Sequence, residues 1–319
     1  MRAKYVDPFT DFGFKRIFGQ EASKPLLRDF LNSLLPPTAQ IAELTLQNNE
    51  RSGRSEADRR AIFDVYCHNE KGERFIVELQ KAKQNNFKDR TVFYSTFPIS
   101  EQAQTGTWAF ELKAVYCVGI LDFVFNDPPT AGAGEVFHEV KLKNQHGQVF
   151  YDKLTYIYLE MPNFHKTEEQ LETRLDQWLY FLKHVEAQEA IPHLFRDAIF
   201  TQAFETAALA RLTRDEWTDY ERSLKYYRDN INTRAYAIQE AVKEALEAVK
   251  EAVKEAVDAA KEVAKEAEKA AVGEAVEQTT EKVRAETLRQ TARTMRDAGL
   301  APNLIIQVTG LSADEIAAL

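Results

Sequence analysis

The feature that most constrains this chain is the uneven distribution of its helix-breaking residues. All ten prolines lie at Pro302 or before it, and none falls between His193 and Ala301. The only glycines in that interval are Gly273 and Gly299. Because helices tolerate proline and glycine least, this last third of the chain is predicted to be helical. The preceding part mixes turn signals with aromatic and β-branched residues, which favours an α/β or α+β domain.

The segment Glu240–Ala271 is predicted to form an extended charged helix. Glu and Lys recur three residues apart, as in Glu247 and Lys250, so that opposite charges support the helix. A heptad seam runs through Val242, Leu246, Val249, Val253, Ala256, Ala260, Val263 and Ala267. Because alanine occupies several seam positions, a single helix or a weak coiled coil is expected, which would act as a spacer or a homo-oligomerisation arm. Four parts are therefore predicted: an α/β domain at 1–190, a helical extension at 191–239, the long charged helix or weak coiled coil at 240–298, and a short helical motif at 299–319.

The C-terminal motif is predicted to contain two short helices. Pro302 suits a first helical turn, Gly310 a turn, and Ser312 with Glu315 a capping box. This pattern resembles a helix-turn-helix. The second helix carries Asp314 and Glu315 but no lysine or arginine, so packing or protein contact is favoured over reading of DNA bases.

A β-hairpin is predicted over Ile62–Gln80. Apolar residues alternate, a glycine-containing turn follows at Asn69–Glu73, and apolar residues alternate again. Strand alternation directs Asp64 to the side opposite Phe63 and Val65. The hairpin therefore sets polar side chains into strands that are otherwise half buried.

The second strand of this hairpin places Glu78 and Gln80 on one face. Centring the turn near Glu70–Lys71 brings Asp64 and Glu78 opposite one another, where two carboxylates repel. The arrangement is reasonable if a hard cation such as Mg²⁺ lies between them, polarises a phosphodiester and generates a nucleophilic hydroxide. The alternative is that both acids are solvent-side residues of an edge hairpin, because D…ExQ alone is a weak pattern.

The order helix, strand, hairpin with D…ExQ, helix and buried strand resembles the PD-(D/E)XK nuclease core. More closely, the chain resembles the Rpn family of recombination-promoting nucleases, also described as PD-(D/E)XK nuclease family transposases. The resemblance covers most of the first 185 residues in order, and a terminal "GLS..EI" motif after a charged helix is usual in that family. The segments that carry it are "DPFTDFGFKRIFG" (Asp7–Gly19), "FDVYCHNEKGERFIVELQ" (Phe63–Gln80), "FKDRTVFYST" (Phe87–Thr96), "YCVGILDFVF" (Tyr116–Phe125), "YLEMPNF" (Tyr158–Phe164) and "DQWLYFLK" (Asp176–Lys183).

The resemblance implies an α/β, restriction-endonuclease-like core with a mixed sheet flanked by helices, followed by a long helical C-terminal arm. It also implies residue roles. Asp64 and Glu78 match the metal-binding acids, with the main-chain carbonyl of Leu79 beside them. Gln80 matches the family's catalytic glutamine, where most of the superfamily has lysine, and Asp11 matches an acidic position that completes the site. The implied activity is a DNA endonuclease that depends on Mg²⁺, with Mn²⁺ as an alternative.

Glutamine offers only a neutral amide, so another group must supply positive charge near the reacting phosphate. Ten basic residues stand against seven acidic ones between Arg51 and Arg90, which favours a DNA-facing side although the whole chain carries −9. The candidates for DNA contact are Lys15, Lys81, Lys83, Lys88 and Arg90.

Other site classes have weaker support. Cys67 and Cys117 lie in apolar runs and are expected to be buried free thiols, and the six histidines show no metal-ligand spacing. No signal region is recognisable, and the longest apolar run, Ala114–Phe125, is shorter than the ~20 residues of a membrane helix. A cytoplasmic protein without a membrane segment is expected. The competing hypothesis is a catalytically weak or inactive nuclease fold that acts as a DNA-binding or protein-interaction scaffold.

Overall fold

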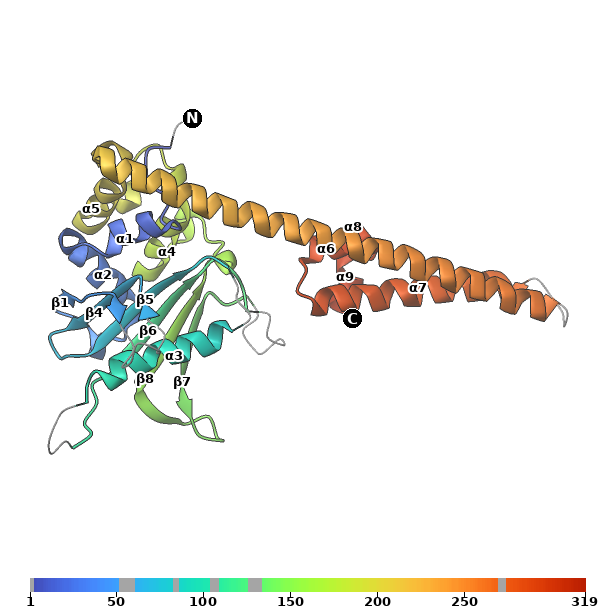
Figure 1. Ribbon diagram of the computed structural model, residues 1–319, viewed down its shortest axis with the longest axis horizontal. Helices are drawn as coiled ribbons and strands as arrows, with labels where there is room; N and C mark the ends of the chain where they lie inside the picture. Colours follow the sequence, from blue (N-terminus) through green and yellow to red (C-terminus); the bar gives the residue numbers. More distant parts are fainter. Residues whose placement is uncertain (1–2, 52–60, 83–85, 104–108, 126–133, 269–273) are drawn as a thin grey trace. The chain divides into compact units, whose positions relative to one another are not determined.

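The computed structural model describes residues 3–51, 61–82, 86–103, 109–125, 134–268 and 274–319. Contacts divide the chain into two units, Met1–Arg228 and Asp229–Leu319. The first holds a sheet with helices on both faces, and the second is helical (Figure 1). Within the described ranges, every helix is too short or too polar to cross a lipid bilayer.

The sheet of the first unit is mixed and has six strands in the order β1-β4-β5-β6-β8-β7. Strands β5, β6 and β8 run parallel to one another, whereas β1, β4 and β7 pair antiparallel with their neighbours. The strand β6 is buried along almost its whole length, as its continuous apolar sequence predicts. The strand bounds are β1 Leu44–Leu46, β4 Val65–Asn69, β5 Arg74–Gln80, β6 Val115–Leu121, β7 Phe137–Lys143 and β8 Val149–Glu160, with β2 Glu50–Arg51 and β3 Ala61–Ile62 forming a separate pair.

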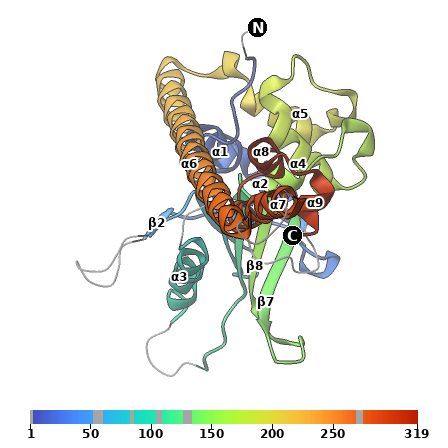
Figure 2. The ribbon, with the colours of Figure 1, turned by 90° about the vertical axis from the view of Figure 1, so that its right-hand side faces the viewer.

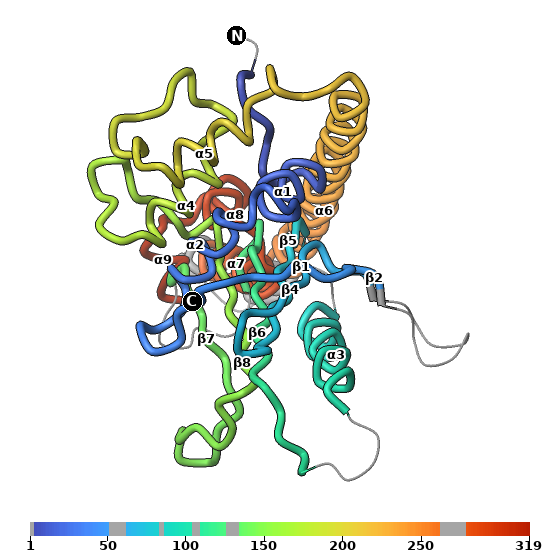
Figure 3. Tube along the Cα trace, turned by 90° about the vertical axis from the view of Figure 1, so that its left-hand side faces the viewer, coloured from blue at the N-terminus to red at the C-terminus, as the bar shows by residue number. Residues whose placement is uncertain are grey.

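The helices of the first unit cover opposite faces of this sheet. Helix α3 lies on one face, and α2, α4 and α5 lie on the other, as Figures 2 and 3 show from opposite sides. The described helices are α1 Asp11–Phe18, α2 Lys24–Leu34, α3 Phe87–Ser100, α4 Arg174–His184, α5 Ala198–Ala207, α6 Arg214–Glu268, α7 Glu274–Asp297, α8 Pro302–Thr309 and α9 Ala313–Ala317.

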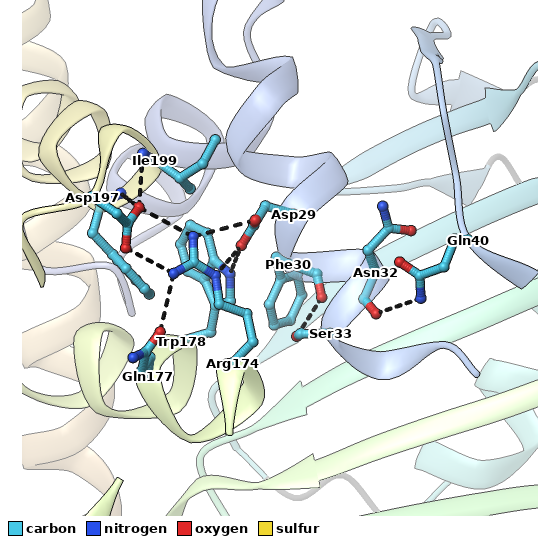
Figure 4. A network of polar contacts seen from close by, with 11 residues as sticks. Asp29, Phe30, Asn32, Ser33, Gln40, Arg174, Gln177, Trp178, Asp197 and Ile199 are labelled. Carbon is cyan, nitrogen blue, oxygen red and sulfur yellow. Dashed lines mark hydrogen bonds and ion pairs between the residues drawn. The ribbon is translucent and has the colours of Figure 1, made fainter. Parts of the chain in front are cut away.

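The larger core lies between the sheet and the α2, α4 and α5 layer. Trp178 and Phe181, three residues apart on α4, are both buried there. The Arg174 guanidinium joins three elements, because it binds Asp29 of α2 at 2.7 Å and Asp197, the N-cap of α5, at 2.8 Å (Figure 4). The Trp178 indole also donates to Asp29, at 2.7 Å. This network holds the helical layer in register over the apolar core.

The smaller core lies between the sheet and α3. Phe63, Ile76 and Phe87 pack there against residues of β6 and β8. The Ser95 and Tyr156 hydroxyls share a hydrogen bond of 2.8 Å, which ties α3 to β8. Pro98 lies in the last turn of α3, where the helix continues to Ser100.

The second unit confirms the predicted features of the C-terminal motif. Ser312 and Glu315 form a capping box, Pro302 opens α8, and Gly310 adopts φ +70° between the two short helices. Apolar residues of α7, α8 and α9 form their own small core around Met295 and Ile305.

Candidate metal centre

The predicted hairpin is present, and its register brings the two acids together. Val65 of β4 pairs with Val77 of β5, which places Asp64 beside Glu78. The Asp64 N–H donates to Glu78 Oε1 at 3.2 Å, and the Leu79 N–H donates to Asp64 Oδ2 at 2.7 Å. The carboxylates are therefore fixed by main-chain groups on the two opposite arms of one hairpin.

One detail of the predicted hairpin is wrong. Phe63 and Val65 do not share a face, because Phe63 packs in the small core under α3 and Val65 packs in the large core. The chain bends at Asp64, which belongs to neither β3 nor β4. At this point the Asp64 carboxylate accepts the hydrogen bond of the Leu79 N–H. In an uninterrupted ladder, a main-chain carbonyl would accept that bond.

Burial and mutual repulsion make the two carboxylates hard to ionise together. Burial, followed by the charge of Asp64, raises the pKa of Glu78 to about 8. Burial likewise raises the pKa of Asp64. The charges of Lys15, Lys81 and Arg90 act in the opposite direction on one acid or the other. The site therefore favours a proton or a cation between the acids.

The donor set fits a hard cation. Among the described residues, no hydrogen-bond donor is bonded to Asp64 Oδ1, which leaves an oxygen of this partly buried carboxylate for a ligand. The described part of the chain also contains no group of three or more His, Cys, Asp and Glu side chains arranged to hold a metal. An ion here would complete its coordination with main-chain oxygen and water, as Mg²⁺ commonly does.

Gln80 connects the acids to helix α3. Its side chain is buried, and its amide nitrogen donates to Glu78 Oε2 at 3.1 Å. The Arg90 guanidinium donates to the amide oxygen of the same side chain. A cavity of about 20 Å³, room for one water molecule, lies beside Glu78, Gln80 and Arg90. Arg90 is predicted from the sequence as a DNA contact, and its inward bond to Gln80 is not among the predictions.

The remaining predicted site residues lie at or near the edge of this site. Asp11 is close enough for its charge to raise the pKa of Asp64, and its own carboxylate pairs with Lys15 at 2.9 Å. Lys81 is more than half buried, which lowers its pKa, and its Nζ lies 5.6 Å from the ring centroid of Tyr227. Lys88 is exposed, with its Nζ 5.3 Å from a phenylalanine ring centroid. Lys83 lies outside the described residues.

A second group of acids and tyrosines, which was not predicted from the sequence, lies close to Lys81. Burial raises the pKa of Asp7 to about 6, and the neighbouring charges of Glu186 and Asp122 act in the same direction. The Tyr227 hydroxyl lies 3.4 Å from Asp122 Oδ2, and the Tyr220 hydroxyl accepts the Asp7 N–H at 3.1 Å. Both tyrosines belong to the start of α6. Their partners lie more than 100 residues away in the sequence, so local sequence patterns do not indicate these contacts.

A comparison with protein-family models gives one match. The model of the family described as PD-(D/E)XK nuclease family transposase matches residues 8–237, well over half of the chain. The chain belongs to this family. The matched segment contains both acids, Gln80 and Arg90. Membership supports a nuclease-type function, and nucleases of this family typically use divalent metal ions. Searches of curated proteins and of solved structures gave no match.

Proposed function

We propose that this protein is a DNA endonuclease of the recombination-promoting type that hydrolyses phosphodiester bonds with Mg²⁺, or with Mn²⁺ in its place. The observation that carries the proposal is the pair Asp64 and Glu78, two partly buried carboxylates that lie side by side on one hairpin and each accept a main-chain hydrogen bond. Such a pair costs folding free energy unless a cation or a proton separates the charges.

The acidic residues of the site are proposed to have different roles in hydrolysis. Asp64, Glu78 and the main-chain carbonyl of Leu79 would hold the ion, which supplies polarisation of the phosphodiester and a bound water of lowered pKa. Asp11 adds negative charge at the open side of the site and keeps Lys15 in place through their ion pair.

Positive charge for the developing phosphorane comes from lysines. Lys81 and Lys15 both act electrostatically on Asp64, so each lies near the position that a bound phosphate would take. Because Lys81 is partly desolvated, its charge acts on that position more strongly than a fully solvated lysine would. Lys88, and Lys83 outside the described residues, are proposed to contact the DNA backbone, and such phosphate contacts make binding depend on salt.

Plasmid cleavage tests the proposal. Supercoiled plasmid is incubated with wild-type protein, Asp64→Ala or Glu78→Ala, in Mg²⁺ or in Mn²⁺, and each variant is checked for a folded state by thermal unfolding. The matched control is Asp152→Ala, which removes an exposed aspartate on β8. We expect wild type and the control to nick the plasmid and the two site variants to lose nicking. Equal nicking by wild type and Asp64→Ala would refute the proposal.

A second candidate is a catalytically weak or inactive scaffold that binds DNA or protein. The observation that favours it is the state of Gln80, whose amide nitrogen bonds Glu78 while its oxygen bonds Arg90. Titration calorimetry separates the two functions, because a scaffold would bind DNA without binding Mg²⁺ or Mn²⁺.

The proposed partner of the C-terminal helix is a second copy of the chain. Val242, Leu246 and Val253 of the predicted seam are half buried in the second unit, which leaves part of each side chain for another copy. Light scattering of the full chain is expected to show an oligomer that deletion of Glu240–Ala271 dissociates. A monomer before and after the deletion would contradict this assignment.

A further inference from the structure

We propose that Arg90 is a positioning residue of the metal centre: it holds the Gln80 amide in the one orientation that presents its nitrogen to Glu78. This inference rests on the proposed function, since it assigns a role at the same site. Its basis is a chain of contacts from Arg90 to the Gln80 oxygen and from the Gln80 nitrogen to Glu78 Oε2.

The donors and acceptors of the three side chains determine which way the Gln80 amide is oriented between Arg90 and Glu78. A guanidinium has only donors, so the atom that faces Arg90 has to be the amide oxygen. The amide nitrogen is then directed at Glu78, 3.1 Å away. With the amide reversed, two oxygens would face each other at Glu78 and two donors would face each other at Arg90. Arg90 therefore selects between two amide orientations of nearly equal shape.

Helix α3 holds Arg90 over the sheet. The Ser95 hydroxyl of α3 shares a hydrogen bond with the Tyr156 hydroxyl of β8, and Thr91, one helical turn before Ser95, lines the same small cavity as Tyr158 of β8. The Arg90 guanidinium also lies 5.5 Å from the Tyr94 ring centroid, a distance suited to a cation–π contact. These contacts fix the height and rotation of the helix, so Arg90 meets Gln80 in a defined geometry.

The charge of Arg90 contributes as well. The positive charge of Arg90 lowers the pKa of Glu78, whereas the negative charge of Asp64 raises it. Gln80 is buried, so the bond from Arg90 is shielded from water and its orienting effect is stronger than at the surface. Glu78 is thus held by the Asp64 N–H at one oxygen and by the Arg90–Gln80 pair at the other.

Metal binding without DNA tests the role. Mn²⁺ is titrated by calorimetry into full-length wild type, Arg90→Met and Arg90→Lys, with Arg28→Met as a control that removes the same kind of side chain from α2, on the opposite face of the sheet. We expect Arg90→Met to weaken Mn²⁺ binding about 10–100-fold, the range for residues that orient metal ligands. Arg90→Lys, which retains charge and a donor, is expected to weaken it less, and Arg28→Met to leave it unchanged.

A double-variant cycle shows whether Arg90 acts through Gln80. If it does, adding Arg90→Met to the Gln80→Met variant should change the Mn²⁺ affinity by no more than about twofold, because the side chain through which Arg90 acts is already gone. Thermal unfolding of each variant identifies losses caused by a displaced α3, and Arg90→Lys preserves the test if Arg90→Met does not fold. Wild-type Mn²⁺ affinity in Arg90→Met, or an undiminished effect of Arg90→Met in the Gln80→Met background, would overturn the inference.

The outcomes separate this inference from the nuclease proposal. If Arg90→Met binds Mn²⁺ more weakly while wild type and Asp64→Ala nick plasmid equally, the positioning role of Arg90 is supported and the proposed endonuclease function is refuted. Nicking that depends on Asp64, together with wild-type Mn²⁺ affinity in Arg90→Met, would support the nuclease and overturn the role of Arg90. A folded wild type that binds no Mn²⁺ would overturn both.

Discussion

Replacing Asp64 by asparagine should stabilise the metal-free protein at alkaline pH. The asparagine carbonyl can accept the Leu79 N–H that Asp64 Oδ2 accepts at 2.7 Å. Its amide takes the place of Oδ1, to which no donor in the described part of the chain is bonded, and can donate to Glu78. The substitution therefore keeps the shape and hydrogen bonds of the site and removes one of two facing charges.

The magnitude follows from the charges and their pH dependence. Two unit charges roughly 5 Å apart repel by about 3 kcal/mol at an effective dielectric constant of about 20. The pKa of Glu78 in the folded protein is raised from 4.5 to about 8, so the stability that depends on its proton is fully present below pH 4.5 and is lost as the pH rises through 8. The gain from Asp64→Asn should therefore grow between pH 6 and pH 9, to about 2–3 kcal/mol.

Urea unfolding in EDTA, followed by tryptophan fluorescence, to which the buried Trp178 contributes, measures this gain at pH 6, 7.5 and 9. The control Asp152→Asn changes an exposed aspartate on β8 and should stay within about 0.5 kcal/mol of wild type. Adding Mg²⁺ should stabilise wild type and not Asp64→Asn, because only wild type keeps both ligand carboxylates. A variant less stable than wild type at pH 9, or a gain that does not change with pH, would refute the reasoning.

Two further predictions concern the framework around the site. Arg174→Met should lower the free energy of unfolding by about 1–3 kcal/mol, since it leaves Asp29 and Asp197 without their guanidinium, and an unchanged urea midpoint would contradict that network. Burial raises the pKa of the Cys67 and Cys117 thiols, so iodoacetamide at pH 8 should label them only in urea, and rapid labelling of the folded protein would show that the cores are open.

The hairpin could be predicted because its determinants are local. Two alternating runs enclose a turn in which Gly72 adopts φ +77°, and the turn alone sets the register that brings Asp64 to Glu78. The family resemblance added the mixed sheet and the helical arm, and the family match bears out this fold. The division of the chain into four parts stays a prediction.

The remainder of the site depends on contacts that alternation does not encode. The bend at Asp64 follows from a side-chain acceptor replacing a ladder carbonyl, so a strict period of two places Phe63 on the wrong face. Arg90 meets Gln80 only because α3 crosses the sheet, and Tyr227 meets Lys81 only because α6 returns to the site from far along the chain. The recurrence of Arg90, Thr91, Tyr94 and Ser95 at helical spacing is the one signal that could have indicated an inward polar face.

The most direct test of the metal centre is anomalous diffraction from a crystal of the full chain soaked with Mn²⁺. The account predicts a peak between the Asp64 and Glu78 carboxylates, about 2.1 Å from an oxygen of each. The main-chain carbonyl of Leu79 should provide a further ligand. Asp64 and Glu78 facing each other as they do here, with no peak between them, would contradict it.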